Sequence, residues 1–426
     1  MTLILFGVLF LMLMLGVPIS ISLGIAVVCG IIKSGNLNLM PIVAQRMFTQ
    51  LDNFTLMAVP LFILAGNIME KGGISIRLIQ FLSLLLRKIN ARLACITVVA
   101  SAFFGAISGS NPATVAAIGG ITYPHMRDKG YPPDVAAAVA ASSGTLGVVI
   151  PPSIPMVTYA VTASVSIGTM FMAGVVPGVL LAVALVTANV LVNKKYDAKD
   201  TRRVPAREYF LSFKDALLAL IMPVIILGGI YGGFFTPTEA AAVACVYALI
   251  ISCFVYKELT LKELWPIFLN SAISSAVVLF VVALSAPFAY FMTTKNIPTI
   301  IAQSVLSVFS SKVALVLMMN VILLFLGCFL ETQSIILLVT PIFLTMIGPM
   351  GLTPVELGII IIVNTSIGMI TPPMGVNLFV ACGIAKVSLE QVSRRLAPYL
   401  IAELIVLLVI SYLPATISWL PGALGV

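Results

Sequence analysis

Two proline pairs interrupt apolar segments that are long enough to lie in a membrane. Pro151-Pro152 follows the run Ser142-Ser-Gly-Thr-Leu-Gly-Val-Val-Ile, and Pro372-Pro373 follows a similar run in the second half of the chain. Proline has no backbone N–H and clashes with the carbonyl four residues earlier, so a helix must break at each pair. Broken backbone at membrane depth is tolerated only inside protein or beside a watery cavity. For one break alone, a kink without a ligand is an equally good explanation.

The two breaks belong to an internal repeat, which favours a binding site over an accidental kink. Adding 221 to a residue number relates the two runs without a gap, as in Gly130 and Gly351, Thr145 and Ser366, Gly147 and Gly368, and Pro151 and Pro372. We therefore expect two halves, residues 1–213 and 214–426. Helix breaks at matching positions of two repeats are the best sequence indication of the binding site of a secondary transporter.

Composition indicates a polytopic all-α membrane protein. Hydrophobic residues make up 61% of the chain and charged residues only 9%, with a mean hydropathy of +1.17. The net charge of +8 would suggest nucleic acid in a soluble protein, but here the basic residues lie in short loops, where they set topology and indicate no nucleic acid. We expect no cleaved signal peptide, so Met1 should stay in the mature protein. The six cysteines occur singly, so neither a disulfide framework nor a metal cluster is expected.

Each half is predicted to contain about five membrane crossings, one re-entrant helical hairpin and one broken helix. The hairpins are predicted at 92–126 and 312–347, because their arms are too short to cross a hydrocarbon core of about 30 Å. The broken helices follow at 133–163 and 354–385. Polar residues at helical spacing predict interfacial amphipathic helices at 74–90 and 298–311.

These elements predict two bodies that move relative to each other. The transport body would consist of residues 92–163 and 312–385, and the scaffold of residues 1–71, 168–293 and 396–413. Residues 36–52 form a more polar stretch after the first two apolar segments. Apolar scaffold spans could contact either a partner subunit or only lipid.

The distribution of charge predicts the orientation of the chain in the membrane. If the basic loop 194–214 is cytoplasmic, only Lys33, Arg46, Lys295 and Lys312 of the 23 basic residues lie outside. The positive-inside rule supports this arrangement. An odd number of crossings per half then makes the second half an inverted copy of the first, and we expect Met1 and Val426 to be periplasmic. Inverted repeats of this kind provide alternating access.

Oxygen-bearing residues gather at the hairpin tips and helix breaks, where hydroxyl, amide and carbonyl oxygens suit a hard cation such as sodium. The predicted sodium ligands are Ser108, Gly109, Ser110, Asn111, Thr145, Gly147, Ile150, Thr332, Gln333, Ser366, Gly368 and Thr371. N-terminal ends of half-helices attract anions, so an anionic substrate is expected near Ser143, Pro152, Asn364, Pro373 and Asn377. The alternative for each residue alone is that small polar side chains allow close helix packing.

Three carboxylates in apolar surroundings are further candidates, namely Glu239, Glu331 and Glu403. Glu239 follows Thr236-Pro-Thr and is equally explained as a helix cap, while Glu403 could face a partner subunit. The sequence contains no Ser-His-Asp set, HExxH motif or phosphate loop, which argues against an enzyme.

Several motifs together resemble the large membrane subunit of TRAP transporters, the DctM-like proteins. They are Gly16-Val-Pro-Ile-Ser20, Gly105-Ala-Ile-Ser-Gly-Ser-Asn-Pro-Ala-Thr114, Phe235-Thr-Pro-Thr-Glu239 and Thr371-Pro-Pro-Met-Gly-Val-Asn-Leu378. The resemblance covers essentially the whole chain. The second tip, Glu331-Thr-Gln-Ser, differs from the Ser-Asn pattern of the first, which makes equivalence of the two sodium sites doubtful.

The resemblance implies an elevator-type uptake system of the bacterial inner membrane, driven by sodium ions. Its expected partners are a small four-helix membrane subunit in a separate chain and a periplasmic substrate-binding protein, and its substrates are organic acids such as C4-dicarboxylates or sialic acid. A stand-alone sodium–carboxylate elevator transporter and an ion channel are the alternatives.

Overall fold

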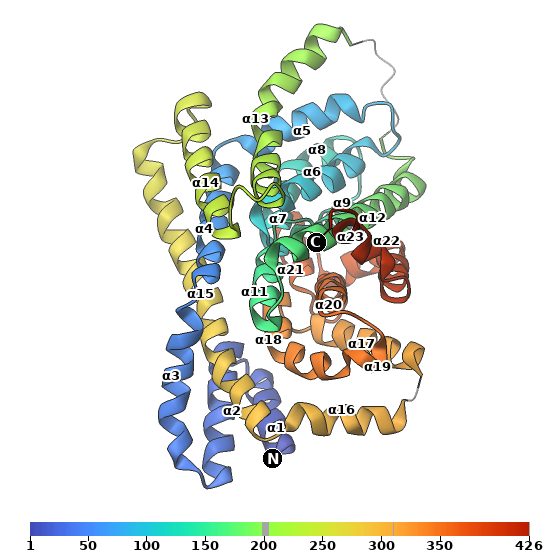
Figure 1. Cartoon of the computed structure of the whole chain (residues 1–426). Coiled ribbons are helices and arrows are strands. Elements are labelled where there is room, and N and C mark those ends of the chain that lie inside the picture. Colours follow the sequence, from blue (N-terminus) through green and yellow to red (C-terminus); the bar gives the residue numbers. More distant parts are fainter. Residues whose placement is uncertain (198–203, 310, 426) are drawn as a thin grey trace.

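The computed structural model describes residues 1–197, 204–309 and 311–425 and is helical throughout these ranges, with no strand among them (Figure 1). Seven of the described helices are long and apolar enough to cross a membrane, or eight if the bent pair 133–149 and 154–163 is one span. The predicted fold class, an all-α polytopic membrane protein, is confirmed. Residues 198–203 of the basic loop and Val426, on which part of the predicted topology depends, lie outside the described residues.

The first half contains the following elements in chain order: α1 (Thr2–Met14), α2 (Ile19–Ser34), η1 (Leu37–Leu39), α3 (Met40–Leu51), η2 (Phe54–Met57), α4 (Ala58–Lys71), α5 (Ile74–Leu85), α6 (Arg92–Ser108), α7 (Asn111–Thr114), the π-helical η3 (Val115–Gly119), α8 (Gly120–Asp128), α9 (Pro133–Ser143), α10 (Leu146–Val149), α11 (Ile154–Ala163) and α12 (Ile167–Asn193).

The second half continues with α13 (Ala206–Tyr231), α14 (Pro237–Ile250), the π-helical η4 (Ile251–Val255), α15 (Leu261–Thr294), α16 (Ile297–Val308), α17 (Lys312–Gly327), α18 (Thr332–Phe343), η5 (Leu344–Met346), α19 (Ile347–Met350), α20 (Pro354–Gly368), α21 (Val376–Ala385), α22 (Leu389–Tyr412) and α23 (Ala415–Ala423).

Both elements predicted to be re-entrant are helical hairpins at nearly the predicted positions. Hairpin 1 consists of α6, α7, η3 and α8 (residues 92–128), and hairpin 2 runs from α17 to α19 (residues 312–350). Each is followed by a broken helix, α9 to α11 in the first half and α20 to α21 in the second. The first of these bends by 41° at its break. The order hairpin, broken helix and long helix therefore occurs twice along the chain.

Three parts of the sequence-based description differ from the structure. The polar stretch 36–52, for which no element was predicted, contains helix α3, whose start is supported by Pro41 in its first turn. The tip of hairpin 2 lies at 328–331, so Thr332 and Gln333 already belong to α18. Helix α23 was not predicted; it packs on α12.

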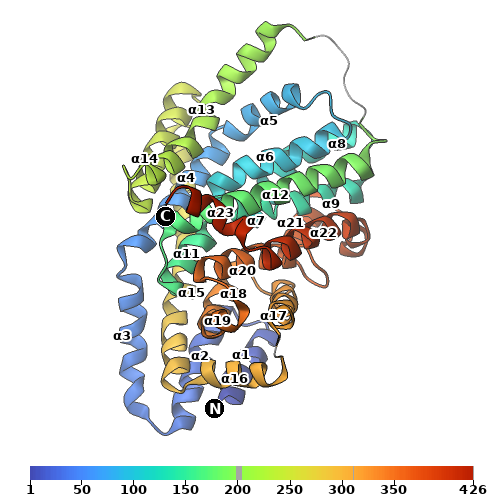
Figure 2. The same cartoon turned by 45° about the vertical axis from the view of Figure 1, so that its right-hand side comes forward.

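Helices α12 and α22 pack on the hairpins and broken helices rather than with the other predicted scaffold helices. Helix α12 contacts α6, α20 and α22, and α22 contacts α9 and α20. We therefore define a hairpin module, α6–α12 and α17–α23, and a flanking module, α1–α4 and α13–α15 (Figure 2). The predicted scaffold ranges 168–192 and 396–413 belong to the hairpin module by packing.

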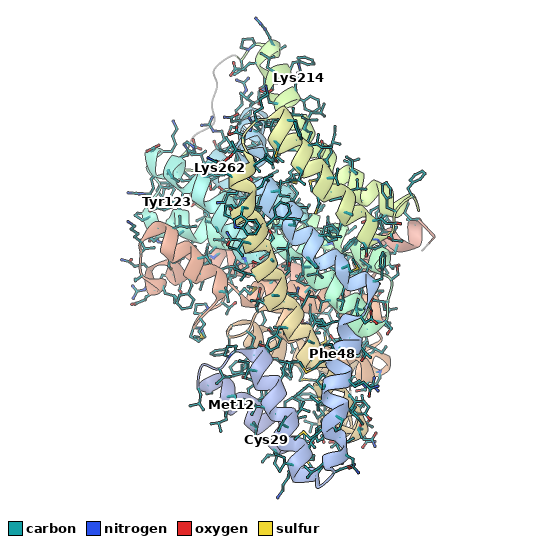
Figure 3. All side chains as sticks on the ribbon, turned by 90° about the vertical axis from the view of Figure 1, so that its left-hand side faces the viewer. Met12, Cys29, Phe48, Tyr123, Lys214 and Lys262 are labelled. Atoms are coloured by element: carbon teal, nitrogen blue, oxygen red, sulfur yellow. The ribbon has the colours of Figure 1, made fainter. Side chains whose placement is uncertain are left out.

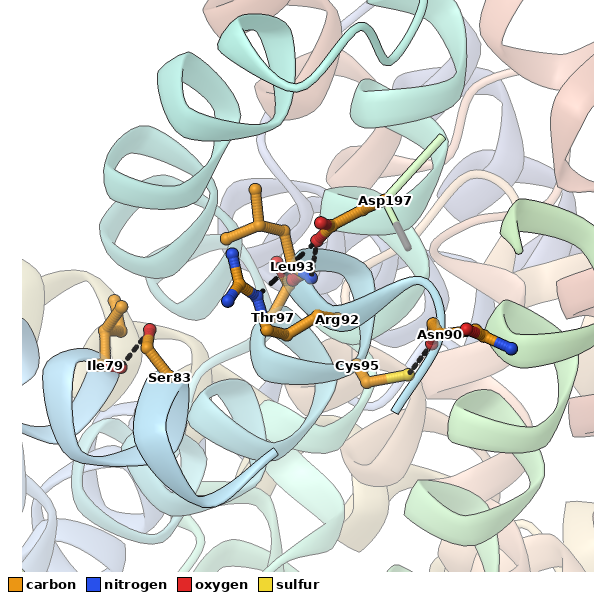
Figure 4. Close-up of polar contacts among 8 residues, drawn as sticks. All are labelled: Ile79, Ser83, Asn90, Arg92, Leu93, Cys95, Thr97 and Asp197. Atoms are coloured by element: carbon orange, nitrogen blue, oxygen red, sulfur yellow. Dashed lines mark hydrogen bonds and ion pairs between the residues drawn. The ribbon is translucent and has the colours of Figure 1, made fainter. Parts of the chain in front are cut away.

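Buried polar contacts explain this arrangement of α12 and α22. The Tyr399 hydroxyl donates to Asn189 Oδ1 at 3.2 Å and accepts a hydrogen bond from Asn193 Nδ2 at 2.6 Å. Just beyond α12, Asp197 Oδ2 accepts a hydrogen bond from the Leu93 N–H at 2.9 Å, at the start of hairpin 1 (Figure 4). A polar pair buried between two helices costs free energy if it separates, so these contacts hold α12 on both α22 and hairpin 1.

Helices α5 and α16 connect the modules at opposite ends of the molecule (Figures 1 and 2). Helix α5 contacts α13 and α6, and α16 contacts α15 and α18. Lys214 and Lys262 lie toward the end that carries α5, whereas Met12, Cys29 and Phe48 lie toward the other end (Figure 3). This separation agrees with the charge-based orientation.

The orientation can be tested with single cysteines in a background that lacks the six native ones. We expect a cysteine at Lys262 to be protected from an impermeant maleimide in intact cells, because the loop before α15 is predicted to be cytoplasmic. A cysteine at Asn36 should be labelled. Permeabilised cells provide the control, since both positions are exposed and should then react. Labelling of Lys262→Cys from outside would show that the orientation is reversed.

Candidate functional site

A cavity of about 350 Å³ lies between the two hairpin tips and the flanking module. Helices α4 and α15 form one wall, and the hairpin tips with parts of both broken helices form the other. The polar residues that line it are Asn67, Glu70, Ser108, Ser110, Asn111, Ser274, Glu331, Thr332 and Gln333. The cavity therefore brings together predicted ligand residues from both halves.

The tip of hairpin 1 is a tight turn that glycine makes possible. Gly109 has a φ of +58°, and a Cβ at this position would lie 2.9 Å from the backbone nitrogen of Ile154. The Thr114 hydroxyl donates to the Ser110 carbonyl at 2.8 Å and lies 3.1 Å from the Ser108 hydroxyl. The turn thus packs directly against the first helix break and presents its oxygens to the cavity.

Asn111 connects the tip of hairpin 1 to the breaks of both halves. Its Oδ1 accepts a hydrogen bond from the Val148 N–H at 2.9 Å, and its Nδ2 donates to Ser366 Oγ at 2.7 Å. The Ser366 hydroxyl in turn donates to the Thr145 carbonyl at 2.7 Å. This link between the halves could not be predicted from the sequence, because Asn111 and Ser366 are 255 positions apart.

Paired glycines allow each hairpin to touch the broken helix of its own half. A Cβ on Gly105 would lie 2.8 Å from the Cα of Gly147, and a Cβ on Gly368 would lie 2.5 Å from the Cα of Gly327. Backbone this close cannot move aside as a side chain can. The predicted ligands Gly147 and Gly368 therefore have a clear packing role in the structure.

The close approach predicts a stability effect for Gly368→Ala. The added methyl group must push α20 away from α17, and overpacking of this kind costs about 1–3 kcal/mol. We expect a lower midpoint of thermal unfolding in detergent. Gly383→Ala in α21 is the matched control, because nothing lies within 4 Å of a Cβ at Gly383. Equal midpoints for the two variants would contradict the packing role.

The tip of hairpin 2 is held less firmly than that of hairpin 1. Gln333 is 6% exposed, and its Oε1 has no hydrogen-bond partner in the part of the chain that the structure describes. The Thr332 hydroxyl lies 3.5 Å from the Met369 sulfur, which is a weak acceptor. Glu331 lines the same cavity. These oxygens are available to a ligand, as the Asn111 side chain is not.

The remaining predicted residues lie away from this cavity. Thr371 donates to the Ile367 carbonyl, Ser143 donates to the Val139 carbonyl, and Asn364 donates to Asn320. Thr145, Gly147, Ile150, Pro152, Pro373 and Asn377 are also absent from its lining. Asn377 is fully buried, and neither atom of its amide has a hydrogen-bond partner among the described residues. The residues predicted to contact the substrate do not line this cavity together, so their role stays a prediction.

The structure shows the partners of two of the three candidate carboxylates, Glu239 and Glu403. Glu239 completes a capping box, because its Oε2 accepts from the Thr236 N–H and the Thr236 side chain accepts from the Glu239 N–H. Glu403 does not face outward toward a partner: it is fully buried, and its Oε1 lies 2.7 Å from the Thr145 hydroxyl.

Comparison with known proteins gives the family. The family model described as "Tripartite ATP-independent periplasmic transporter, DctM component" matches residues 6–416. The chain belongs to this DctM family. It is therefore a TRAP permease and a multi-pass protein of the bacterial inner membrane.

The relatives of this DctM-family permease carry different substrate names. It is 44% identical to the isethionate TRAP transporter permease protein DctMQ of Oleidesulfovibrio alaskensis over 98% of the chain, and spans 66% of that protein. It is 38% identical to the C4-dicarboxylate large permease DctM of Rhodobacter capsulatus, over 99% of each chain. It is 36% identical to the sialic acid large permease SiaM of Vibrio cholerae, over 95% of each.

Solved structures support the fold alone. The YdaH transporter of Alcanivorax borkumensis matches 92% of this chain and 91% of its own with a TM-score of 0.65 and 13% identity. The MtrF structure of Neisseria gonorrhoeae matches 89% of this chain and 85% of its own with a TM-score of 0.56 and 14% identity. The transporter architecture is thus shared beyond the range of sequence similarity.

Proposed function

We propose that this chain is the large permease subunit of a TRAP system that takes up an organic acid anion together with sodium ions. The cavity at the hairpin tips carries the proposal. The names of the relatives of this permease make isethionate, C4-dicarboxylates and sialic acid candidate substrates. All three are anions with several oxygen atoms.

The charge of the cavity supports co-transport of a cation. Glu70 and Glu331 line it, and none of the described residues that line it is basic. The nearest ion pair is Glu70 with Lys71, whose nitrogen lies 3.5 Å from the carboxylate. An anion entering such a site is repelled unless cations enter with it. Hydroxyl, amide and backbone oxygens at both tips are suitable ligands for sodium.

The position of the cavity supports release toward the cytoplasm in this conformation. The residues of α4 that line the cavity lie between Ile63 and Glu70. This end of α4 is next to Lys71, which the charge distribution places on the cytoplasmic side. On the other side, Leu56, Val281, Val282 and Leu337 form a separate apolar cluster between the modules. This cluster would close the periplasmic path while the cavity is open inward.

As partners we propose a small membrane subunit and a periplasmic substrate-binding protein, in keeping with the family. The exposed apolar faces of α13 and α15, including Val224, Leu269 and Phe280, could contact that subunit. The same faces would otherwise contact only lipid.

Uptake into proteoliposomes tests the function. The permease, its small subunit and the binding protein would be combined with labelled isethionate, a C4-dicarboxylate or sialic acid, under an inward sodium or potassium gradient. We expect saturable uptake of one acid that requires sodium and the binding protein. Uptake that is equal with potassium would contradict sodium coupling. Uptake without the binding protein would instead support a stand-alone transporter, and uptake that does not saturate would support a channel.

A further inference from the structure

Glu403 is a buried carboxyl group on α22 that the proposed transport site does not use directly. It is fully buried and reaches the break of the first half, where its Oε1 lies 2.7 Å from Thr145 Oγ1. Its Oε2 has no hydrogen-bond partner, and no ion pair includes Glu403, in the part of the chain that the structure describes. A buried carboxyl group with one specific contact needs an explanation.

The contact falls on a residue that lies between two short helices. Helix α9 ends at Ser143 and α10 begins at Leu146, so Gly144 and Thr145 form the joint between them. The helical hydrogen bonds tighten there, because the Thr145 N–H donates to the Ser142 carbonyl and the Gly147 N–H to the Gly144 carbonyl, each three residues back. Helix α22, by contrast, is a helix of 24 residues that packs on α9, α12 and α20. Glu403 thus connects this joint to a helix that packs on three others.

Thr145 also supports the tip of hairpin 1 through its backbone. Its carbonyl accepts a hydrogen bond from the Ser366 hydroxyl at 2.7 Å, and Ser366 Oγ accepts one from Asn111 Nδ2 at 2.7 Å. Asn111 lines the cavity. The path from Glu403 to the cavity therefore passes through three residues, each joined to the next by a short contact.

The surroundings favour a hydrogen-bonding role for Glu403 over an electrostatic one. The charged groups on its own helix are engaged elsewhere, since Arg395 pairs with Asp134 at 2.7 Å and Arg394 with Glu390. An uncompensated charge in a fully buried position is strongly destabilising. The Thr145 hydroxyl also lies 2.7 Å from the Ser142 carbonyl, so it can donate there and accept a hydrogen bond from a protonated Glu403. This arrangement requires no charge, and a glutamine at this position could form it through its amide N–H.

We propose that Glu403 is a positioning residue for the tip of hairpin 1. It fixes Thr145 by hydrogen bonding, and Thr145 fixes Ser366 and Asn111 at the cavity. Only the link to sodium rests on the proposed function, because the position of the tip can be measured without transport.

The experiment has one arm that needs no transport activity. A cysteine at Ser110, which lines the cavity, reports the position of the tip by its rate of reaction with a maleimide in purified protein without native cysteines. We expect Glu403→Leu to change this rate about tenfold, the size expected for loss of one buried hydrogen bond. Glu403→Gln should stay within about threefold of the parent. The second arm measures the sodium concentration for half-maximal uptake, which Glu403→Leu should raise about tenfold and Glu403→Gln should restore.

A double-mutant cycle separates positioning from general loss of packing. Thr145→Val removes the hydroxyl, and Thr145→Ser keeps it. We expect Thr145→Val to reproduce the labelling change of Glu403→Leu, Thr145→Ser to resemble the parent, and the double variant Glu403→Leu with Thr145→Val to be no worse than either single variant. If Glu403→Leu does not fold, the comparison of Thr145→Val with Thr145→Ser still tests whether the hydroxyl positions the tip.

Several results would overturn the proposal. They are an unchanged labelling rate in folded Glu403→Leu or Thr145→Val, additive effects in the double variant, or a Glu403→Gln variant as impaired as Glu403→Leu. Failure of the proposed function looks different: the parent itself would then show no sodium-dependent uptake, while the labelling arm would still report on Glu403.

Discussion

A crosslink between cysteines placed at Leu56 and Leu337 should stop uptake almost completely. Leu56 belongs to η2 beside the flanking helix α4, and Leu337 belongs to α18 of the hairpin module. Both lie in the apolar cluster with Val281 and Val282. If the hairpin module slides along the flanking module to open the cavity outward, these side chains must separate. A short bifunctional thiol reagent would hold them together and trap the inward-open conformation.

A crosslink within the hairpin module is the control. Asn320 on α17 donates a hydrogen bond to Ser411 on α22 at 3.0 Å, and both side chains are buried. Cysteines at these two positions should be joined without loss of uptake, because α17 and α22 are expected to move together. Both pairs would be measured in proteoliposomes before and after crosslinking. Continued uptake with the Leu56 and Leu337 pair fully crosslinked would show that the modules do not move in this way.

The control also tests the main difference between the sequence analysis and the structure. Helix α22 was predicted in the scaffold because its long apolar face is typical of a span that contacts lipid or a partner. The Asn320 to Ser411 hydrogen bond and the contact of Glu403 with Thr145 place it against the hairpins instead. Such contacts join residues that are 91 and 258 positions apart. Local hydropathy cannot reveal partners at that distance.

The elements that were predicted well are those with a local chemical cause. Proline fixes the start of α9 at Pro133 and of α20 at Pro354, and Gly109 allows the turn between α6 and α7. Because the two halves repeat, a helix break or hairpin predicted in one half also predicted its counterpart in the other. At the site, the residue types at the tips were found for the same reason. The Asn111 to Ser366 link was not, because it depends on how the halves pack.

The sequence also suggested that the two tips are unequal, and the structure gives this difference a physical form. The Asn111 side chain is hydrogen-bonded to the Val148 N–H and the Ser366 hydroxyl. In the hairpins, Gly105 matches Gly327 at a spacing of 222, and the same spacing matches Asn111 with Gln333. Gln333 leaves its Oε1 without a partner among the described residues. Hairpin 1 is thus tied to the breaks, while hairpin 2 offers a free oxygen to the cavity. We expect ligands to order the second tip more than the first.

Asn111→Ala should raise the sodium concentration for half-maximal uptake about ten- to a hundredfold. The change leaves the Val148 N–H and the Ser366 hydroxyl without the partner that holds them in place. Leaving a buried polar group without its partner costs about 1–3 kcal/mol, and most of this span corresponds to the expected change. The sodium dependence would be measured in proteoliposomes, together with the midpoint of thermal unfolding.

Ser274→Ala is the matched control for Asn111→Ala. Ser274 lines the same cavity from α15 of the flanking module and belongs to neither tip. Its removal should leave the sodium dependence within about twofold of the parent, even if the affinity for the acid changes. Asn111→Ala that folds normally and keeps the parent's sodium dependence would assign Asn111 to packing alone. A large effect of Ser274→Ala on sodium would move the cation site away from the tip of hairpin 1 and toward the flanking module.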